Sequence, residues 1–125
     1  MSPALYREFL TEPERMICAG HDFTAIHLHP ASFFLLDDLL AKEDLKAIEV
    51  NKDVGGPSIK EMLPNLRKIK EKKCLILWGD LDADDIRCLQ ENLSASGLFL
   101  FLIAPDMKTA RELLTQIRAW PTTSQ

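Results

Sequence analysis

Four short apolar segments recur along this chain, and each is followed by a stretch with the periodicity of an amphipathic helix. The segments predict strands over residues 23–29, 45–51, 74–79 and 98–104. Because a helix between two strands returns the chain to the same end of the sheet, this alternation predicts a parallel sheet. Ligands of such sheets bind at the carboxyl ends of the strands, so the residues at the four tips are the first candidates for function.

The number of strand–helix units constrains the architecture. A length of 125 residues supports one domain, 1–125, and four units are half of an eight-unit barrel. A helix that starts at Ser2 and Pro3, is interrupted around Pro13 and ends near Gly20 precedes them. We therefore expect an α/β fold, the parallel (βα)4 half of a TIM barrel preceded by an N-terminal helix.

A half-barrel leaves apolar edges that need a covering. A homodimer or a separate chain carrying the N-terminal half-barrel would supply it, and the homodimer is our preferred expectation. Flattening of the sheet into a doubly wound sandwich is the third alternative.

Individual residues predict details of the elements. Ser58 and Glu61 have the spacing of a capping box, whereas Pro64 predicts a kink or a late start of regular hydrogen bonding in the same helix. The helix after the first strand is expected from Ala31 to about Lys42. The third strand, residues 74–79, is a continuous apolar run, which is typical of a strand buried on both faces.

Charge and hydrophobicity argue against two classes, nucleic-acid-binding and membrane-spanning proteins. The net charge of −4 argues against a nucleic-acid protein, and no apolar run approaches the roughly 20 residues that span a bilayer. One basic cluster is interpreted as the solvated end of a helix, and it consists of Arg67, Lys68, Lys70, Lys72 and Lys73.

Three cysteines without paired spacing, Cys18, Cys74 and Cys88, predict reduced core thiols. The first residues lack the order of a signal peptide. We expect a cytoplasmic protein with no nucleic-acid or membrane partner.

His27 and His29 are the sharpest local signal. They lie two residues apart at the carboxyl end of a predicted strand, so their side chains project from one face. Two imidazoles on one face can bind a metal such as zinc or an anionic group, or can form hydrogen bonds within a pocket. His21 precedes the strand, at the opposite end of the sheet, and is expected to be structural.

Other strand tips supply further candidates. Oxygen ligands that could complete a site around the histidines are Asn51, Asp53, Asp80, Asp82 and Asp106. Trp78 could line a pocket for a flat ligand or belong to the core. The glycines of residues 55–58 precede a helix, but they lack the spacing of a phosphate-binding motif, so we interpret them as a turn.

Several segments together resemble the uroporphyrinogen decarboxylase superfamily, which includes cobalamin-dependent methyltransferases. Residues 2–9, Ser-Pro-Ala-Leu-Tyr-Arg-Glu-Phe, are similar to its "S-P-x-x-[FY]-x-x-F" helix. Residues 26–29, Ile-His-Leu-His, resemble its "H-x-[DC]" strand. The similarity continues in the same order through residues 45–50, 77–81 and 98–110, so it covers the whole chain.

The resemblance implies the C-terminal half of a TIM barrel from porphyrin biosynthesis or methyl-group metabolism. It implies a lyase or a methyltransferase, with a tetrapyrrole or a corrinoid as ligand. The methyltransferase branch binds zinc through the histidine and cysteine of "H-x-C" and a cysteine at the last strand tip. Here His27 matches the first ligand, His29 stands in the place of the second, and Asp106 follows Ala104 and Pro105 where the last cysteine would be.

The arginine and aspartate on which decarboxylation depends belong to the first half of that barrel and have no counterpart here. We therefore expect a chain that is not active alone, with unknown catalytic residues. The alternative is a non-catalytic ligand-binding or assembly module derived from this barrel. The candidate ligand-binding residues are His27, His29, Asn51, Trp78, Asp80 and Asp106, with His27 and His29 as candidate metal ligands.

Overall fold

A computed structural model describes residues 2–121 of the protein. Its strands are β1 (Ala25–Leu28), β2 (Ala47–Lys52), β3 (Cys74–Gly79) and β4 (Leu98–Leu102). Its helices are α1 (Pro3–Phe9), α2 (Thr11–Ala19), the 3-10 helix η1 (Pro30–Leu35), α3 (Leu36–Leu40), α4 (Ile59–Lys70), α5 (Ala83–Asn92) and α6 (Met107–Arg118).

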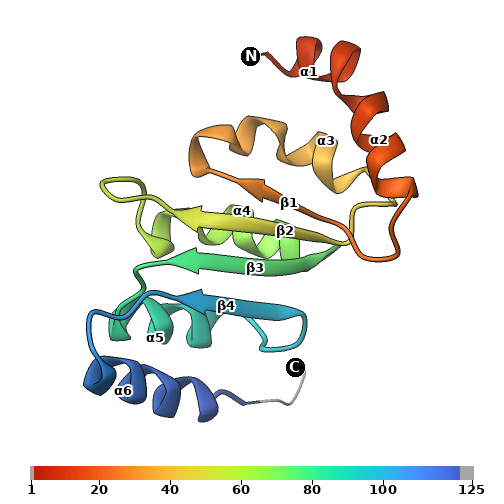
Figure 1. Ribbon diagram of the computed structural model, residues 1–125. Helices are drawn as coiled ribbons and strands as arrows, with labels where there is room; N and C mark the ends of the chain where they lie inside the picture. The colour runs from red at the N-terminus through yellow and green to blue at the C-terminus, as the bar shows by residue number, and fades with distance from the viewer. Residues whose placement is uncertain (1, 122–125) are drawn as a thin grey trace.

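The four strands form one parallel sheet in the order β1-β2-β3-β4 (Figure 1). Each strand therefore lies beside the strand that precedes or follows it in the sequence. A doubly wound sheet would reverse its strand order part-way along the chain, so that alternative is excluded. The expected α/β fold, a (βα)4 half of a TIM barrel with an N-terminal helical segment, is confirmed.

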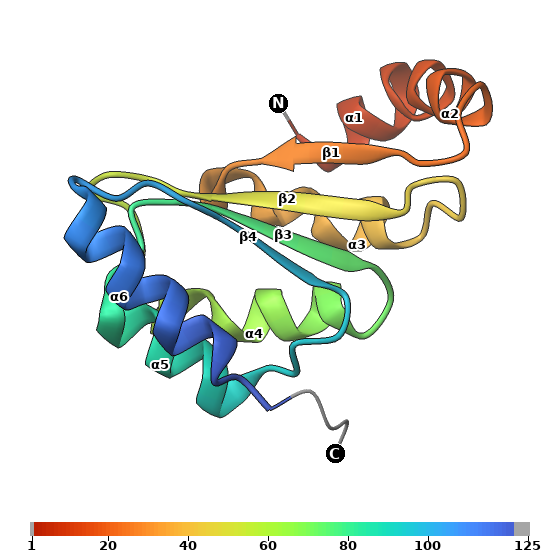
Figure 2. The same cartoon turned by 60° about the horizontal axis from the view of Figure 1, so that its bottom comes forward.

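The helices that follow the strands cover one face of the sheet (Figure 2). On that face Ile48, Val50, Leu75 and Leu77 have no solvent exposure. They belong to one apolar cluster with the inward side chains of the helices, which include Leu39 of α3, Leu66 of α4 and Leu89 of α5. The core therefore lies between the sheet and a single helical layer.

The expectation that β3 is buried on both faces is wrong. Leu75 and Leu77 are fully buried, whereas Ile76 and Trp78, which alternate with them, are only partly buried. Alternating side chains of a strand point to opposite faces, and here helices cover only one of those faces. We call the other one the open face.

The helix N-termini have the capping residues that the sequence predicts, whereas the prolines affect the helices less than expected. Ser2 caps α1, and Ser58 and Glu61 form the capping box of α4. Pro64 lies within α4, which is continuous from Ile59. The N-terminal segment breaks at Leu10 instead of at Pro13, because a proline in the first turn of a helix lacks only an N–H that has no partner there.

The helix expected from Ala31 begins instead as the 3-10 helix η1. His29 precedes it without a side-chain cap, and the Ser32 N–H donates to the His29 carbonyl at 2.8 Å. Such tight turns are frequent at the start of α-helices.

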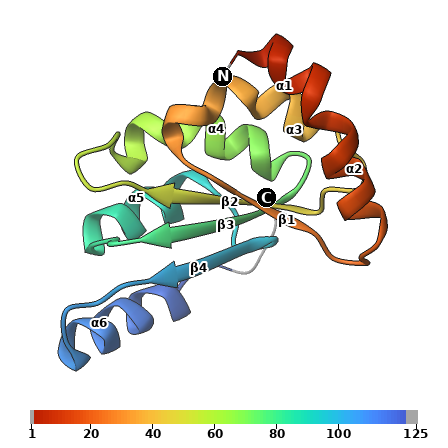
Figure 3. The ribbon, with the colours of Figure 1, turned by 45° about the horizontal axis from the view of Figure 1, so that its top comes forward.

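The two edge strands of the sheet have different helices beside them. The N-terminal helices stand next to β1, and α6 stands next to β4 (Figure 3). Tyr6 anchors the N-terminal pair: it is 2% exposed, its hydroxyl donates to Glu14, and the Lys42 ammonium lies 5.1 Å from its ring centroid. Burial and the Glu14 carboxylate raise the pKa of Tyr6 far above its usual value.

The prediction of reduced core thiols is wrong for Cys74, which is exposed; Cys18 is half-buried, and the half-buried Cys88 packs against the core cluster. Cys74 is the first residue of β3 and alternates with the buried Leu75, so it lies on the open face. In the basic cluster, Arg67 donates to Asn92, Lys68 pairs with Asp37 at 2.6 Å, and Lys73 donates to backbone carbonyls.

None of the helices within residues 2–121 is long and apolar enough to cross a bilayer.

Candidate functional site

The open face of the sheet is polar on β1 and β2 and aromatic on β3 and β4. The strand register aligns His27 with Glu49, Ile76 and Phe99 in one row across the sheet. The next row toward the carboxyl ends aligns Asn51 with Trp78 and Phe101. These side chains occupy the positions that alternate with the buried core residues.

At the carboxyl ends of β1 and β2, four side chains form a continuous hydrogen-bonded row, Glu49–His27–His29–Asp53. His27 Nδ1 lies 2.6 Å from Glu49 Oε1, and His29 Nδ1 lies 2.7 Å from Asp53 Oδ1. The two Nε2 atoms lie 3.0 Å apart, with the rings nearly perpendicular at 79°. The Asn51 amide donates to the same Asp53 oxygen. The prediction that His27 and His29 project from one face is confirmed.

The three hydrogen bonds of this row require one proton more than two neutral imidazoles carry. Each of its three contacts needs one hydrogen, whereas two neutral imidazoles carry only two N–H groups between them. With both carboxylates ionised, the row is complete when one additional proton lies between the Nε2 atoms. A cation that binds both Nε2 lone pairs satisfies the same requirement.

Asp53 is the ionised anchor of this row. Its hydrogen bonds with His29 and with the Asn51 amide hold the pKa of the carboxyl below its usual range. Hydrogen bonds to a carboxylate favour its charged form. Asp53 is therefore an acceptor at neutral pH, and the His29 Nδ1 that faces it is the donor.

The geometry accommodates a tetrahedral metal ion between the two histidines. Zinc–nitrogen bonds of about 2.0–2.1 Å at a tetrahedral angle place two ligand nitrogens about 3.3 Å apart. The Nε2 atoms at 3.0 Å would separate by small rotations of the rings. Within residues 2–121, however, no group of three or more His, Cys, Asp or Glu side chains has the placement to hold a metal. The remaining ligands would come from outside this set.

Aromatic side chains continue the site across β3 and β4. The Trp78 ring lies 5.8 Å from His27 and 6.0 Å from Phe101, edge to face in both cases. Its Nε1 is buried and has no hydrogen-bond partner in the described part of the chain. A buried N–H donor without a partner is costly, and solvent does not reach this atom in the structure.

The other predicted ligands have different hydrogen-bond partners and do not belong to this row. Asp82 and Asp106 are N-caps: their carboxylates accept N–H groups of α5 and α6. Asp80 is exposed, and its backbone carbonyl accepts from the Lys52 ammonium at 2.9 Å. The structure thus brings together His27, His29, Asn51 and Trp78 among the predicted ligand-binding residues, and no hydrogen bond within residues 2–121 links the Asp80 or Asp106 carboxylate to them.

The glycine-containing loop before α4 is a turn, as expected. Gly55 has a φ of 73°, and the Gly56 N–H donates to the Asp53 carbonyl at 3.0 Å. The Ser58 N–H and hydroxyl both donate to the Glu61 carboxylate. The loop therefore positions Asp53 and starts α4.

Glu49 is the member of the row that the sequence-based prediction missed. It precedes Asn51 by two residues, so the same period that paired His27 with His29 places Glu49 and Asn51 on one face. It is also the only acidic residue of β2.

Comparisons of the chain with protein-family models, with curated proteins and with solved structures found no match. The functional argument therefore depends on the chemistry of the open face.

Proposed function

We propose that this chain is the ligand-binding C-terminal half of a uroporphyrinogen decarboxylase-like barrel, with a divalent metal ion of the zinc class held by His27 and His29. The observation that carries the proposal is the row Glu49–His27–His29–Asp53 at the carboxyl end of the open face.

The hydrogen bonds of the row support a metal more specifically than two neighbouring histidines would. Metal-bound histidines almost always donate their other ring N–H to a carboxylate or a carbonyl. Here Glu49 and Asp53 occupy the two Nδ1 positions, so the two Nε2 atoms, 3.0 Å apart, are the ring nitrogens left to bind a cation. When bound there, zinc would supply a Lewis acid with open coordination positions for a ligand.

Charge also favours a cation at this point. The row contains two carboxylates, and the nearby Lys52 ammonium is paired with Asp85. The acidic side chains of a tetrapyrrole would be repelled by Glu49 and Asp53 unless a positive charge lay between them. The aromatic edge formed by Trp78 and Phe101 offers the apolar contact that a flat macrocycle requires.

On this proposal the chain binds the ligand and does not catalyse the reaction alone. The resemblance implies decarboxylation or methyl transfer, with the catalytic arginine and aspartate supplied by the first half of the barrel. This chain's own residues would orient the ligand: the His27–His29 pair through the metal, and Trp78 by stacking.

Zinc titration followed by calorimetry tests the proposal. We expect one zinc ion per chain, and an affinity at least about tenfold lower in His27→Ala and in His29→Ala, since each change removes one of two ligands. His21→Ala is the matched control and should leave zinc binding unchanged. Absence of zinc binding, or an affinity that neither substitution alters, would contradict the metal site.

A fluorescence titration with a tetrapyrrole tests the ligand class. Trp78 lies beside the histidines, whereas Trp120 is 7% exposed and donates to the Leu93 carbonyl behind β4. We expect quenching that is largely lost in Trp78→Phe and retained in Trp120→Phe. Absence of both zinc binding and quenching would favour the alternative, a non-catalytic assembly module.

A further inference from the structure

Cationic side chains gather at the amino ends of the strands, at the opposite end of the sheet from the histidine row. They come from the residue before β2, from the last turns of α4 and from the segment between α4 and β3. Two adjoining hollows of about 410 Å³ and 520 Å³ share Lys70 and Ser96 in their linings. The cations that line these hollows, here called the basic rim, are Lys46, Arg67, Lys70, Lys72 and Lys73.

The cations of the basic rim lack acidic partners. No ion pair within residues 2–121 includes any of the five. Lys46, Lys70 and Lys73 donate to backbone carbonyls, and Arg67 donates to an amide oxygen. Neutral acceptors of this kind position the side chains without cancelling their charge. Five cations exceed by three the carboxylates that line the hollows, Asp22 and Glu71.

A solvated helix end, the interpretation drawn from the sequence, accounts for only part of this rim. Cations in the last turn of α4 interact favourably with the helix dipole, but Lys46 comes from another segment. Burial, and then the neighbouring charges of Lys46 and Lys72, lower the pKa of Lys73, and burial also lowers the pKa of Lys70. Like charges held together partly out of solvent cost free energy, which an anionic partner would offset.

Exposed apolar side chains lie at the same end of the molecule. Phe23 lines a hollow together with the four lysines of the rim and is 92% exposed. Met16 and Ile17 of α2 are 67% and 65% exposed. Only residues 20–24 separate α2 from β1, so the end of this helix also lies at the amino ends of the strands (Figure 1). Bulky apolar side chains beside a group of cations are typical of surfaces that bind anionic membranes.

We propose that the basic rim binds the surface of an anionic lipid bilayer. The five cations lie against the lipid phosphates, and Phe23 enters the boundary between headgroups and acyl chains. A free phosphate or an acidic peptide would use the cations and leave Phe23 in water. A single-stranded nucleic acid could stack a base on Phe23, but it offers nothing to the aliphatic Met16 and Ile17.

A surface contact of this kind needs no membrane-spanning helix. It therefore differs from the expectation drawn from the sequence, which considered spanning segments and the net charge of −4 and not where the charges gather. Each lysine near an anionic surface strengthens binding locally, because the charge of the rest of the molecule is screened over about 8–10 Å.

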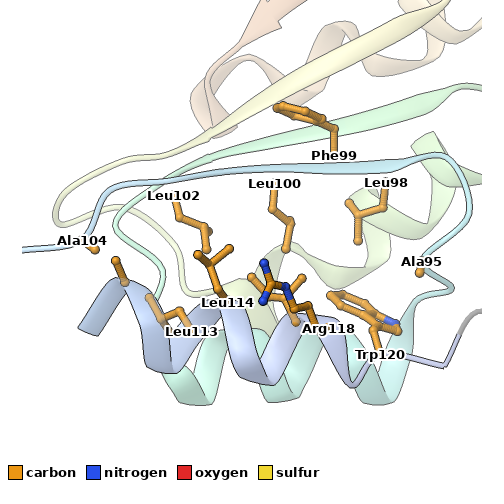
Figure 4. A pocket seen from close by; sticks show the side chains of 12 residues that line it. Ala95, Leu98, Phe99, Leu100, Leu102, Ala104, Leu113, Leu114, Arg118 and Trp120 are labelled. Atoms are coloured by element: carbon orange, nitrogen blue, oxygen red, sulfur yellow. The ribbon is translucent and has the colours of Figure 1, made fainter. Parts of the chain in front are cut away.

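The basic rim stays accessible in the proposed barrel. The first half would add strands along the free edges of β1 and β4. Leu98, Leu100 and Leu102 point toward α6 in an apolar groove beside the β4 edge (Figure 4), so this groove belongs to the closure of the barrel. The rim lies at the ends of the strands and not along their edges. The inference is therefore independent of the metal site and of the proposed function.

Sedimentation of the intact chain with vesicles tests the membrane contact. We expect binding to vesicles of equal parts phosphatidylserine and phosphatidylcholine, and little binding to phosphatidylcholine alone. Raising the salt from about 0.1 M to about 1 M shortens the screening length from about 10 Å to about 3 Å and should release the protein.

Charge variants locate the contact. Lys46 and Lys72 are exposed, so Lys46→Gln/Lys72→Gln should leave the circular dichroism spectrum unchanged. Each lost cation should weaken vesicle binding about fivefold, and the pair about 25-fold. Lys60→Gln/Lys108→Gln is the matched control: it removes the same charge from exposed lysines in the first turns of α4 and α6, at the other end of the sheet, and should bind like the wild type.

An apolar variant tests insertion. Phe23→Ser removes an exposed ring and should weaken vesicle binding roughly tenfold, since burying such a side chain contributes about 1.5–3 kcal/mol. Val54→Ser changes a residue that is equally exposed, in the loop after β2, and should have no effect.

Three results would overturn the membrane contact: no binding to the anionic vesicles at low salt, binding that Lys46→Gln/Lys72→Gln does not weaken, or an equal loss in the Lys60→Gln/Lys108→Gln control. Binding of a single-stranded oligoribonucleotide without binding of vesicles would also overturn it and assign the rim to nucleic acid. Zinc binding should be the same in all of these variants, so failure here is distinguishable from failure of the proposed function.

Discussion

The two faces of the sheet are built from the same four strands and have opposite properties. On the covered face, Ile48, Val50, Leu75 and Leu77 are completely buried against the helices. On the open face, Glu49, Asn51, Ile76 and Trp78 alternate with them and are only partly buried. The polar residues His27, Glu49 and Asn51 thus lie on the face on which the fold does not depend, whereas Lys52, at the end of β2, alternates with Val50 and pairs with Asp85 of α5.

This division separates stability from binding within single strands. Neighbouring residues in β2 and β3 differ in what they contact, so substitutions one position apart should affect different properties. Leu77 and Ile76 of β3 are such a pair, and equal effects of substitutions at the two would contradict the independence of the faces.

The largest effect is expected in the covered face of β3. Leu77→Ala leaves a cavity among fully buried side chains and should lower the free energy of unfolding by about 2–5 kcal/mol. Ile76→Ala, the adjacent residue on the open face, should cost clearly less because that side chain is already partly solvated. Urea denaturation of both variants measures the difference, and equal losses would show that the open face is covered in solution.

A smaller effect, confined to binding, is expected at the carboxylates of the open face. Glu49→Gln and Asp53→Asn remove the charge that orients each imidazole and should weaken zinc binding about 10- to 100-fold. Their urea midpoints should stay close to that of the wild type. Asp80→Asn, an exposed strand-tip aspartate outside the row, is the control, and a loss of zinc affinity there equal to that of Glu49→Gln would argue against the role of the row.

The smallest effect concerns acid sensitivity, to which two aspartates outside the strands contribute, the Asp106 cap of α6 and Asp53 of the row. The Thr109 N–H holds the pKa of the Asp106 cap below its usual range, as His29 and Asn51 do for Asp53. A lowered folded pKa adds stability above the unfolded value of about 3.9, and this stability is lost as the pH falls through the lowered pKa.

Asp106→Asn should therefore keep the cap and reduce the loss of thermal stability between pH 6 and pH 3. Thermal unfolding at the two pH values measures it. A variant that loses as much stability as the wild type would mean that folding does not lower the pKa of Asp106.

The sequence predicted much of this arrangement because strands and caps leave local signals. The strand at residues 74–79 agrees with β3 at both ends, and Ser58 with Glu61 forms the predicted capping box. The common direction of His27 and His29 followed from the two-residue period of a strand.

What could not be predicted depends on relations between segments. The contact between His27 and Glu49 requires the register of β1 against β2, which is set by packing and not by either strand alone. The apolar run of β3 indicated burial on both faces, because its sequence contains no sign that one helical layer is missing. Likewise, nothing local distinguishes Asp82 and Asp106, which cap helices, from Asp53, which joins the row.

The strand order β1-β2-β3-β4 has a consequence for which strands unfold locally first. Each strand pairs only with its neighbour in sequence, as in Ala25 with Ala47 and Leu75 with Leu98, and β1 does not meet β4. Each pairing joins residues more than about 20 positions apart, and parallel pairing of this kind is slow to form. Amide hydrogens of β2 and β3 should exchange most slowly, and β1 and β4 should open first. His27, on the edge strand β1, could then leave the site while Glu49 and Trp78 stay in place on the central strands β2 and β3.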